Sequence, residues 1–202
     1  MKPSGDPPLF GGLMTALVTP FRGDAIDFDA LAEFANWQID QGVQGLVACG
    51  TTGEPTTMNA DERELTVRTV AKAVNGRVPV IAGTGSNCTQ NVIDTAKRYE
   101  DIGCAAQLVV TPYYNKTTQE GLYRHFKKIA EDVDIPLILY NIPGRTGVNM
   151  LPETVARLAQ IPTIVGIKEA SGSLAQVSDI WRLTKGQLAI LSGDDNLFLP
   201  MM

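Results

Sequence analysis

The sequence predicts an α/β protein of the (β/α)₈-barrel type, with about seven of the eight strand-and-helix units present. Apolar, β-branched runs recur at the interval that one strand plus one helix needs. Helical patterns lie between these runs, and polar motifs follow most of them. With 202 residues, 44% of them hydrophobic and 19% charged, the chain is long enough for one substantial core. We therefore predict a single domain over residues 1–202, a partial barrel.

Seven segments are expected to be strands, because each is rich in β-branched and aliphatic residues and is bounded by turn residues. They are residues 15–20, 45–50, 78–85, 107–114, 136–143, 164–171 and 188–195.

Helix starts and stops are visible between the strands. Three pairs have the spacing of a capping box: Asn59 with Glu62, Thr117 with Glu120, and Ser173 with Gln176. Glycines follow four of the periodic segments as C-terminal stops, at positions 42, 76, 103 and 186. Pro152 suits the first turn of a further helix.

Such strict alternation implies a parallel sheet, either closed as a barrel or open and doubly wound. Unusual polar motifs follow six strands, from "GTTGE" after the second to "SGDDN" after the seventh. A barrel spreads its site around one rim in this way, whereas an open sheet binds its ligand at one switch point. Since a barrel needs eight strands and typically about 250 residues, we expect a truncated form of a longer parent. The 202-residue chain itself is expected to be poorly active, because two strand edges stay unpaired.

Charge and hydropathy limit the partners. Lys and Arg number 17 against 22 Asp and Glu, a net charge of −5, and no basic cluster could neutralise a run of phosphates. Nucleic acid is therefore not expected as a partner. The start, "MKPSGDPPLFGG", lacks the apolar segment of a signal peptide, and no later run is long enough to span a bilayer. We expect a cytoplasmic protein without a membrane partner.

No pattern predicts a metal or a redox cofactor. The three cysteines are far apart and are expected to be reduced thiols: Cys49, Cys88 and Cys104. The single histidine, His125 in "YRHFKK", is expected on a helix surface, which leaves no histidine-based triad or multi-histidine metal site. Asp194 and Asp195 indicate a loop or a helix start rather than a metal site.

Lys168, in "TIVGIKEASGS", comes before an apolar run has ended. Burial disfavours the charged form of a lysine, so its amine is a candidate nucleophile at neutral pH. The alternative is that Lys168 extends its ammonium group into water at the strand end, and this stretch alone favours that alternative.

Other strand ends carry groups that could serve such an amine. Thr51 and Thr52 lie in a glycine-flanked turn that suits the binding of a carboxylate or phosphate. The alternative is a tight turn without a ligand. Tyr140 could move protons and Arg145 could bind a carboxylate, or both could be ordinary strand and turn residues. Tyr114 follows another strand and could be packing only. Together they equip a protein to condense a 2-keto acid with a second acid through a Schiff base.

Five motifs of the sequence are "GTTGEPTTM", "VIAGTGSN", "VTPYYNK", "YNIPGRTG" and "GIKEASG". In their order and spacing they resemble the motifs of the dihydrodipicolinate synthase family, and the resemblance extends from Gly11 to Met202. The resemblance implies a TIM barrel of the class I aldolase type. It also implies condensation of pyruvate with aspartate-4-semialdehyde to 4-hydroxy-tetrahydrodipicolinate, in lysine and diaminopimelate biosynthesis, without a cofactor or metal.

The resemblance also implies roles for single residues. Lys168 would form the imine with pyruvate, Tyr140 would relay protons beside it, and Thr51 and Thr52 would hold the pyruvate carboxylate and extend the relay. Gly193 would be a substrate-binding residue.

Further roles concern the second substrate and the neighbouring subunit. Arg145 would bind the carboxylate of aspartate-4-semialdehyde. Tyr114 would complete the relay in the neighbouring subunit, so at least a dimer would be needed, and the parent would be a dimer or tetramer. The family's C-terminal helical region, which supports the tetramer, is absent from this chain.

Two alternatives stay open. N-acetylneuraminate lyases and 2-keto-3-deoxy-sugar-acid aldolases share the lysine and the tyrosine. Arg145 and Thr51 favour the synthase, since the sialic acid lyases commonly have serine where Thr51 stands. The other alternative is an inactive partial barrel.

Lysine inhibits many bacterial and plant members of the family. The resemblance assigns the lysine site to Pro55, Thr56, Ala60, Arg63, Asn87, Asn91 and Tyr113. Asn87 and Tyr113 fit the lysine-sensitive pattern, but histidines are familiar at 60 and 63 and a carboxylate at 91. We therefore expect weak inhibition or none.

Overall fold

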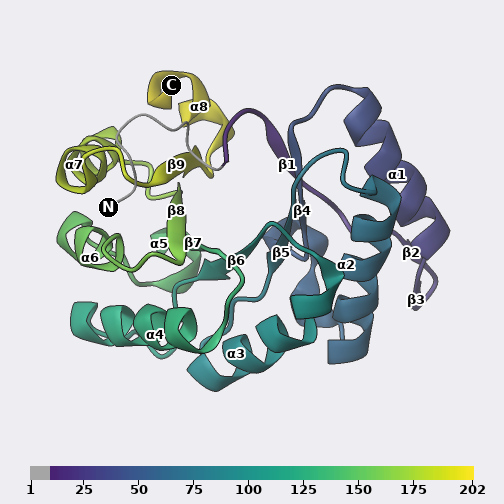
Figure 1. Cartoon of the computed structure of the whole chain (residues 1–202), viewed down its shortest axis with the longest axis horizontal. Coiled ribbons are helices and arrows are strands. Elements are labelled where there is room, and N and C mark those ends of the chain that lie inside the picture. Colours follow the sequence, from purple (N-terminus) through teal and green to yellow (C-terminus); the bar gives the residue numbers. More distant parts are fainter. Residues whose placement is uncertain (1–9) are drawn as a thin grey trace. The chain divides into compact units, whose positions relative to one another are not determined.

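The computed structural model describes residues 10–202 (Figure 1). Most of the N-terminal segment that argues against a signal peptide lies outside these residues. The described chain divides into two compact units, one of residues 12–84 and 94–108 and the other of residues 10–11, 85–93 and 109–202. Helix α3 (Thr89–Arg98) and strand β6 (Ala106–Val110) run from one unit into the other.

The first unit contains a parallel sheet in the order β1-β4-β5-β6. Its other strands are β1 (Met14–Ala16), β4 (Gly45–Ala48) and β5 (Val80–Gly83). Leu46 of β4 pairs with Thr15 on one side and with Val80 on the other, and it is completely buried. A two-stranded antiparallel hairpin, β2 (Phe21–Arg22) with β3 (Ala25–Ile26), was not predicted from the sequence.

Two helices, α1 (Phe28–Asp40) and α2 (Ala60–Val74), lie side by side in this unit (Figure 1). The predicted capping box of α2 is confirmed. Asn59 Oδ1 accepts the N–H groups of Asp61 and Glu62 at 2.9 and 3.0 Å, and Glu62 Oε2 accepts the N–H of Asn59 at 2.8 Å. These bonds satisfy donors that a helix start leaves unpaired.

The second unit contains the parallel strands β7 (Leu137–Asn141), β8 (Ile164–Glu169) and β9 (Ala189–Ser192), in that order. Tyr140 of β7 pairs with Lys168 of β8, which pairs with Leu191 of β9. The helices of this unit are α4 (Gln119–Asp132), α5 (Pro143–Thr146), α6 (Pro152–Leu158), α7 (Leu174–Thr184) and α8 (Phe198–Met201). Figure 1 shows α4, α6 and α7 side by side along these strands.

Two predicted helix starts in this unit are confirmed, and one is wrong by a residue. Pro152 is the first residue of α6, and Ser173 caps α7 by accepting the N–H of Gln176 at 3.2 Å. The reciprocal bond of the predicted capping box is not formed, because the N–H of Ser173 donates to the Ser171 hydroxyl and the Gln176 side chain bonds to Asn149 and Glu169. Thr118 rather than Thr117 caps α4, since its hydroxyl accepts the N–H of Gly121 at 3.2 Å. The two neighbouring threonines offer the same hydroxyl, so the sequence does not distinguish them.

The expected surface position of His125 is wrong. Its side chain is 6% exposed, on the same face of α4 as Leu122, Phe126 and Ile129, each completely buried. These four residues have the i, i+3, i+4, i+7 spacing of a buried helix face, which the charged neighbours in "YRHFKK" obscure.

All seven predicted strands are present within the two units, with a helix after most of them. The alternation of strand and helix with parallel pairing is therefore confirmed. The assignment of the whole chain to one domain stays a prediction. No helix among residues 10–202 is long and apolar enough to cross a membrane.

Candidate active site

Lys168 is the penultimate residue of β8, between Ile167 and Glu169, which are 0% and 2% exposed. Its Nζ lies 4.6 Å from the centroid of the Tyr140 ring on the neighbouring strand. Burial lowers the pKa of Lys168, and the carboxylates of Asp195 and Asp194 oppose this shift without cancelling it. The amine thus lies over an aromatic ring and loses its proton more readily than an exposed lysine, as a nucleophile requires.

Gly193, which follows β9, leaves space for the Lys168 side chain. A Cβ atom at Gly193 would lie 2.7 Å from Cβ of Ala170 and 3.2 Å from Cε of Lys168. The N–H of Gly193 donates to the carbonyl of Glu169 at 2.8 Å, which fixes this close approach. Asp194 directly precedes the short 3₁₀ helix Asp195–Leu197, which agrees with the predicted loop or helix start.

Arg145 lies on α5, directly after β7, and its side chain is exposed. Within residues 10–202 it forms no ion pair and no side-chain hydrogen bond. An unpaired guanidinium presents its full set of donors to a ligand, and its planar fork matches a carboxylate.

Tyr114 lies in the loop after β6 and is 90% exposed. Its backbone has φ of +70°, an uncommon conformation for a residue with a side chain. Strand β6 ends at Val110, so the strand does not extend to the two tyrosines at 113 and 114. The loop therefore presents a large aromatic side chain to solvent in a strained conformation.

Thr51 and Thr52 belong to the first unit, in a short 3₁₀ turn, Thr51–Gly53, after β4. Both are exposed, and neither hydroxyl bonds to another residue in the described part of the chain. Left-handed residues flank the turn, Cys49 and Glu54, each with φ of +54°. The turn thus keeps two hydroxyls available, as the predicted anion-binding loop requires.

A polar cluster missed by the sequence analysis connects to β7 and β8. Its members are Asn141, Glu169, Asn149 and Gln176. Asn141 and Glu169 directly follow Tyr140 and Lys168 in the motifs "YN" and "KE". Their position directly after these two residues is the feature of the sequence that indicates the cluster.

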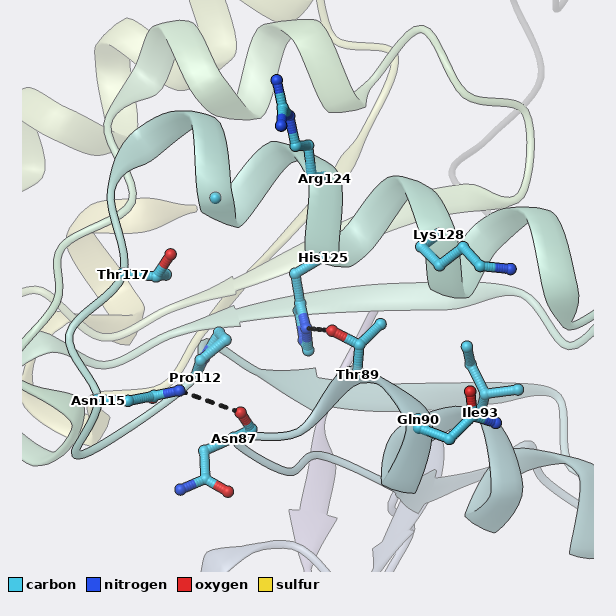
Figure 2. Close-up of a pocket in the computed structure, with 11 residues that line it drawn as sticks. Asn87, Thr89, Gln90, Ile93, Pro112, Asn115, Thr117, Arg124, His125 and Lys128 are labelled. Atoms are coloured by element: carbon cyan, nitrogen blue, oxygen red, sulfur yellow. Dashed lines mark hydrogen bonds between the residues drawn. The ribbon is translucent and has the colours of Figure 1, made fainter.

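A separate cavity of about 500 Å³ lies in the second unit, next to α4 (Figure 2). His125 points into this region, with its Nδ1 2.9 Å from the hydroxyl of Thr89, and Asn115 donates to the carbonyl of Asn87 at 3.3 Å. Burial lowers the pKa of His125 to about 4, so the ring is neutral at neutral pH. None of the predicted catalytic residues lines this cavity.

Within residues 10–202, no three His, Cys, Asp or Glu side chains gather in a way that could hold a metal ion. The three cysteines are free thiols. Burial raises the pKa of the Cys49 thiol to about 12 and that of Cys104 to about 11, so neither is a thiolate nucleophile at neutral pH.

Comparison with known proteins identifies the family of this chain. Residues 9–202 match the profile of the dihydrodipicolinate synthetase family. The chain belongs to this family. It is 52% identical over 194 residues to the 4-hydroxy-tetrahydrodipicolinate synthase of Pelobacter propionicus, an alignment that covers 96% of this chain and 67% of the relative.

Solved dihydrodipicolinate synthases confirm the fold. The Acinetobacter baumannii enzyme, crystallised with pyruvate, matches with a TM-score of 0.92 and 45% identity over 94% of this chain and 66% of that one. The Cyanidioschyzon merolae enzyme, crystallised with lysine, matches with a TM-score of 0.93 and 44% identity over 96% and 67%. The predicted barrel of the dihydrodipicolinate synthases is therefore confirmed as the fold class. This family member spans about two thirds of the length of the relatives it matches.

Proposed function

We propose that the protein is a 4-hydroxy-tetrahydrodipicolinate synthase, which condenses pyruvate with aspartate-4-semialdehyde in lysine and diaminopimelate biosynthesis. The observation that carries the proposal is the half-buried Lys168 amine, which lies over the ring of Tyr140 at the end of β8 and has a lowered pKa. Membership of the family supports the choice of substrates.

In the proposed reaction the Lys168 amine attacks the keto carbon of pyruvate and water leaves, which gives an imine. Loss of a proton from the methyl group converts this imine into an enamine, which attacks the aldehyde carbon of the second substrate while the aldehyde oxygen takes up a proton. The amine of aspartate-4-semialdehyde then attacks the imine carbon and displaces the Lys168 amine, which closes the ring of the product and restores the free lysine. Tyr140, next to the amine, is placed to relay protons. Gly193 would admit the substrate beside Lys168, because a side chain at this position would fill that space.

The remaining roles rest chiefly on family membership. Thr51 and Thr52, whose hydroxyls are available, would bind the carboxylate of pyruvate and extend the proton relay. Arg145 would bind the carboxylate of aspartate-4-semialdehyde. The exposed, strained Tyr114 would enter the site of a neighbouring subunit, so the natural protein would be a homodimer or homotetramer. We further propose that the two units form one catalytic domain and that the protein acts in the cytoplasm.

Borohydride trapping tests the proposal. The longest natural chain that contains these 202 residues, called here the full chain, should gain one reduced pyruvate when incubated with pyruvate and borohydride. Peptide mapping should place this addition on Lys168, since none of the other lysines within residues 10–202 lies next to these groups at a strand end. Labelling at another lysine, or no labelling, would contradict the proposal.

The second substrate separates the synthase from the related aldolases. The full chain should consume pyruvate only when aspartate-4-semialdehyde is added, and it should not cleave N-acetylneuraminate or 2-keto-3-deoxy-sugar acids. Cleavage of either compound at a comparable rate would identify an aldolase.

Feedback inhibition by lysine is expected to be weak or absent. A lysine ligand carries two cationic amines, and a charge-assisted bond to a carboxylate is typically worth about 1.5 to 3 kcal/mol. Asn91 stands where the family commonly has that carboxylate, and Arg63 adds a like charge. A titration of the full chain with lysine measures this effect.

Asn91→Glu serves as the matched variant and should lower the lysine concentration needed for half-inhibition. Half-inhibition of the unchanged protein well below about 1 mM lysine would show that our interpretation of these positions is wrong.

A further inference from the structure

The polar cluster, in which Asn141 and Glu169 are buried, lies next to the Lys168 and Tyr140 pair but on the other face of the strands. Asn141 pairs with Glu169 in the register directly after Tyr140 and Lys168. Successive side chains of a strand point to opposite faces, so Asn141 and Glu169 point away from the face on which the lysine and tyrosine meet. The cluster therefore lies behind this pair, on the face of the strands opposite to the Lys168 amine.

The Glu169 carboxylate is buried and is held by neutral donors. It accepts the N–H of Ser171 at 2.7 Å and the Nε2 of Gln176 at 3.1 Å, and Nδ2 of Asn141 lies 3.2 Å from both of its oxygens. It forms no ion pair within residues 10–202, and it is 2% exposed. A carboxylate without a cation is costly to bury unless hydrogen bonds replace its hydration, as these three donors do.

The other bonds of the cluster connect these strands to the segment after Arg145. Asn141 Oδ1 accepts the N–H of Met150 at 2.9 Å, and Asn141 Nδ2 donates to Asn149 Oδ1 at 2.8 Å. Asn149 and Gln176 exchange two further hydrogen bonds, of 2.8 and 3.1 Å. One network thus joins the ends of β7 and β8, the start of α7 and the segment between α5 and α6.

We propose that Glu169 is a positioning residue of the reaction, whose carboxylate fixes the ends of β7 and β8 and thereby holds the Lys168 amine over the Tyr140 ring. The inference rests on the proposed function and deepens it, because it assigns a role to a group that touches no substrate. Through Asn141 and Asn149 the same carboxylate is also connected to the segment that follows α5, the helix of Arg145.

Glu169→Gln tests this role because it keeps the size of the side chain but replaces one acceptor oxygen with an NH₂ donor. The N–H of Ser171 cannot become an acceptor, and the Asn141 oxygen already accepts the N–H of Met150. At least one buried donor would then face another donor, so the strand ends must move. Small displacements of a reacting group reduce rates strongly.

The experiment measures borohydride trapping of pyruvate in the full chain at saturating pyruvate. Two quantities are recorded, the fraction of chain that is trapped and the rate constant of trapping for that fraction. Glu169→Gln should lower the rate constant by about tenfold or more. Glu153→Gln, the same change at an exposed glutamate of α6, should alter it less than about twofold.

A role in stability alone would lower the trapped fraction and leave the rate constant unchanged. If the unchanged protein is trapped and Glu169→Gln is trapped at the same rate, the positioning role is overturned. If the unchanged protein is not trapped, the proposed function fails instead. Should Glu169→Gln not fold, Gln176→Ala removes one of the three donors to Glu169, together with the two bonds to Asn149. This variant should slow trapping about threefold or more, and an unchanged rate would overturn the inference.

Discussion

Replacing Lys168 with methionine is expected to abolish pyruvate trapping and to lower turnover by about a thousandfold or more. Methionine fills the space of the lysine stem but has no amine, so no imine can form and the remaining groups can only bind substrate. The measurement is the steady-state rate of the full chain with both substrates, combined with trapping. Lys72→Met, at an exposed lysine of α2, is the matched control and should retain both activities.

The pH dependence of stability separates loss of chemistry from loss of fold. Burial lowers the pKa of Lys168 in the folded chain, so the unfolded chain binds more protons at this position, and stability rises with pH up to the pKa of the unfolded lysine. Lys168→Met removes this dependence. At neutral pH the variant should therefore unfold at the same temperature as the unchanged protein or above it, and the difference should shrink as pH rises.

If Lys168→Met still turned over at a tenth of the normal rate, this result would contradict the assigned role of Lys168.

The strand positions and the polar motifs at their ends could be predicted from sequence because both have local signals. Apolar runs flanked by turn residues mark β4 and β8, and Lys168 is conspicuous because it interrupts such a run. The capping box of α2 is equally local, since Asn59 and Glu62 are three residues apart. Each of these features depends on residues that are near in sequence.

The buried cluster could not be predicted in the same way, because its bonds join distant residues. Glu169 and Asn141 are 28 positions apart, and Asn149 and Gln176 are 27 apart. Their contacts follow from the strand register and from the packing of α7, which composition and periodicity do not give. The buried position of His125, in contrast, has a local signal, because His125 shares a helix face with Leu122 and Phe126. The charged residues next to it in the sequence point to a surface position instead, and they obscure this signal.

Replacing Arg145 with alanine is expected to leave pyruvate trapping unchanged and to lower kcat/KM for aspartate-4-semialdehyde by about a hundredfold. The two carboxylates are assigned to different groups, and a bidentate, charge-assisted contact is typically worth several kcal/mol once its partner is bound. Arg145 is exposed and unpaired within residues 10–202, so its loss should change the free energy of unfolding by less than about 0.5 kcal/mol.

Two further variants make this expectation specific. Arg145→Lys keeps the charge but not the planar fork, so kcat/KM should fall between the values of the unchanged protein and Arg145→Ala. Arg182→Ala, at an exposed arginine of α7 that within residues 10–202 pairs only with Asp179, should leave the use of both substrates unaffected. Because trapping needs pyruvate alone, it isolates the first half of the reaction from the second. If Arg145→Ala slowed trapping as much as it slowed use of the aldehyde, then Arg145 would act on pyruvate or on the fold rather than on the second carboxylate.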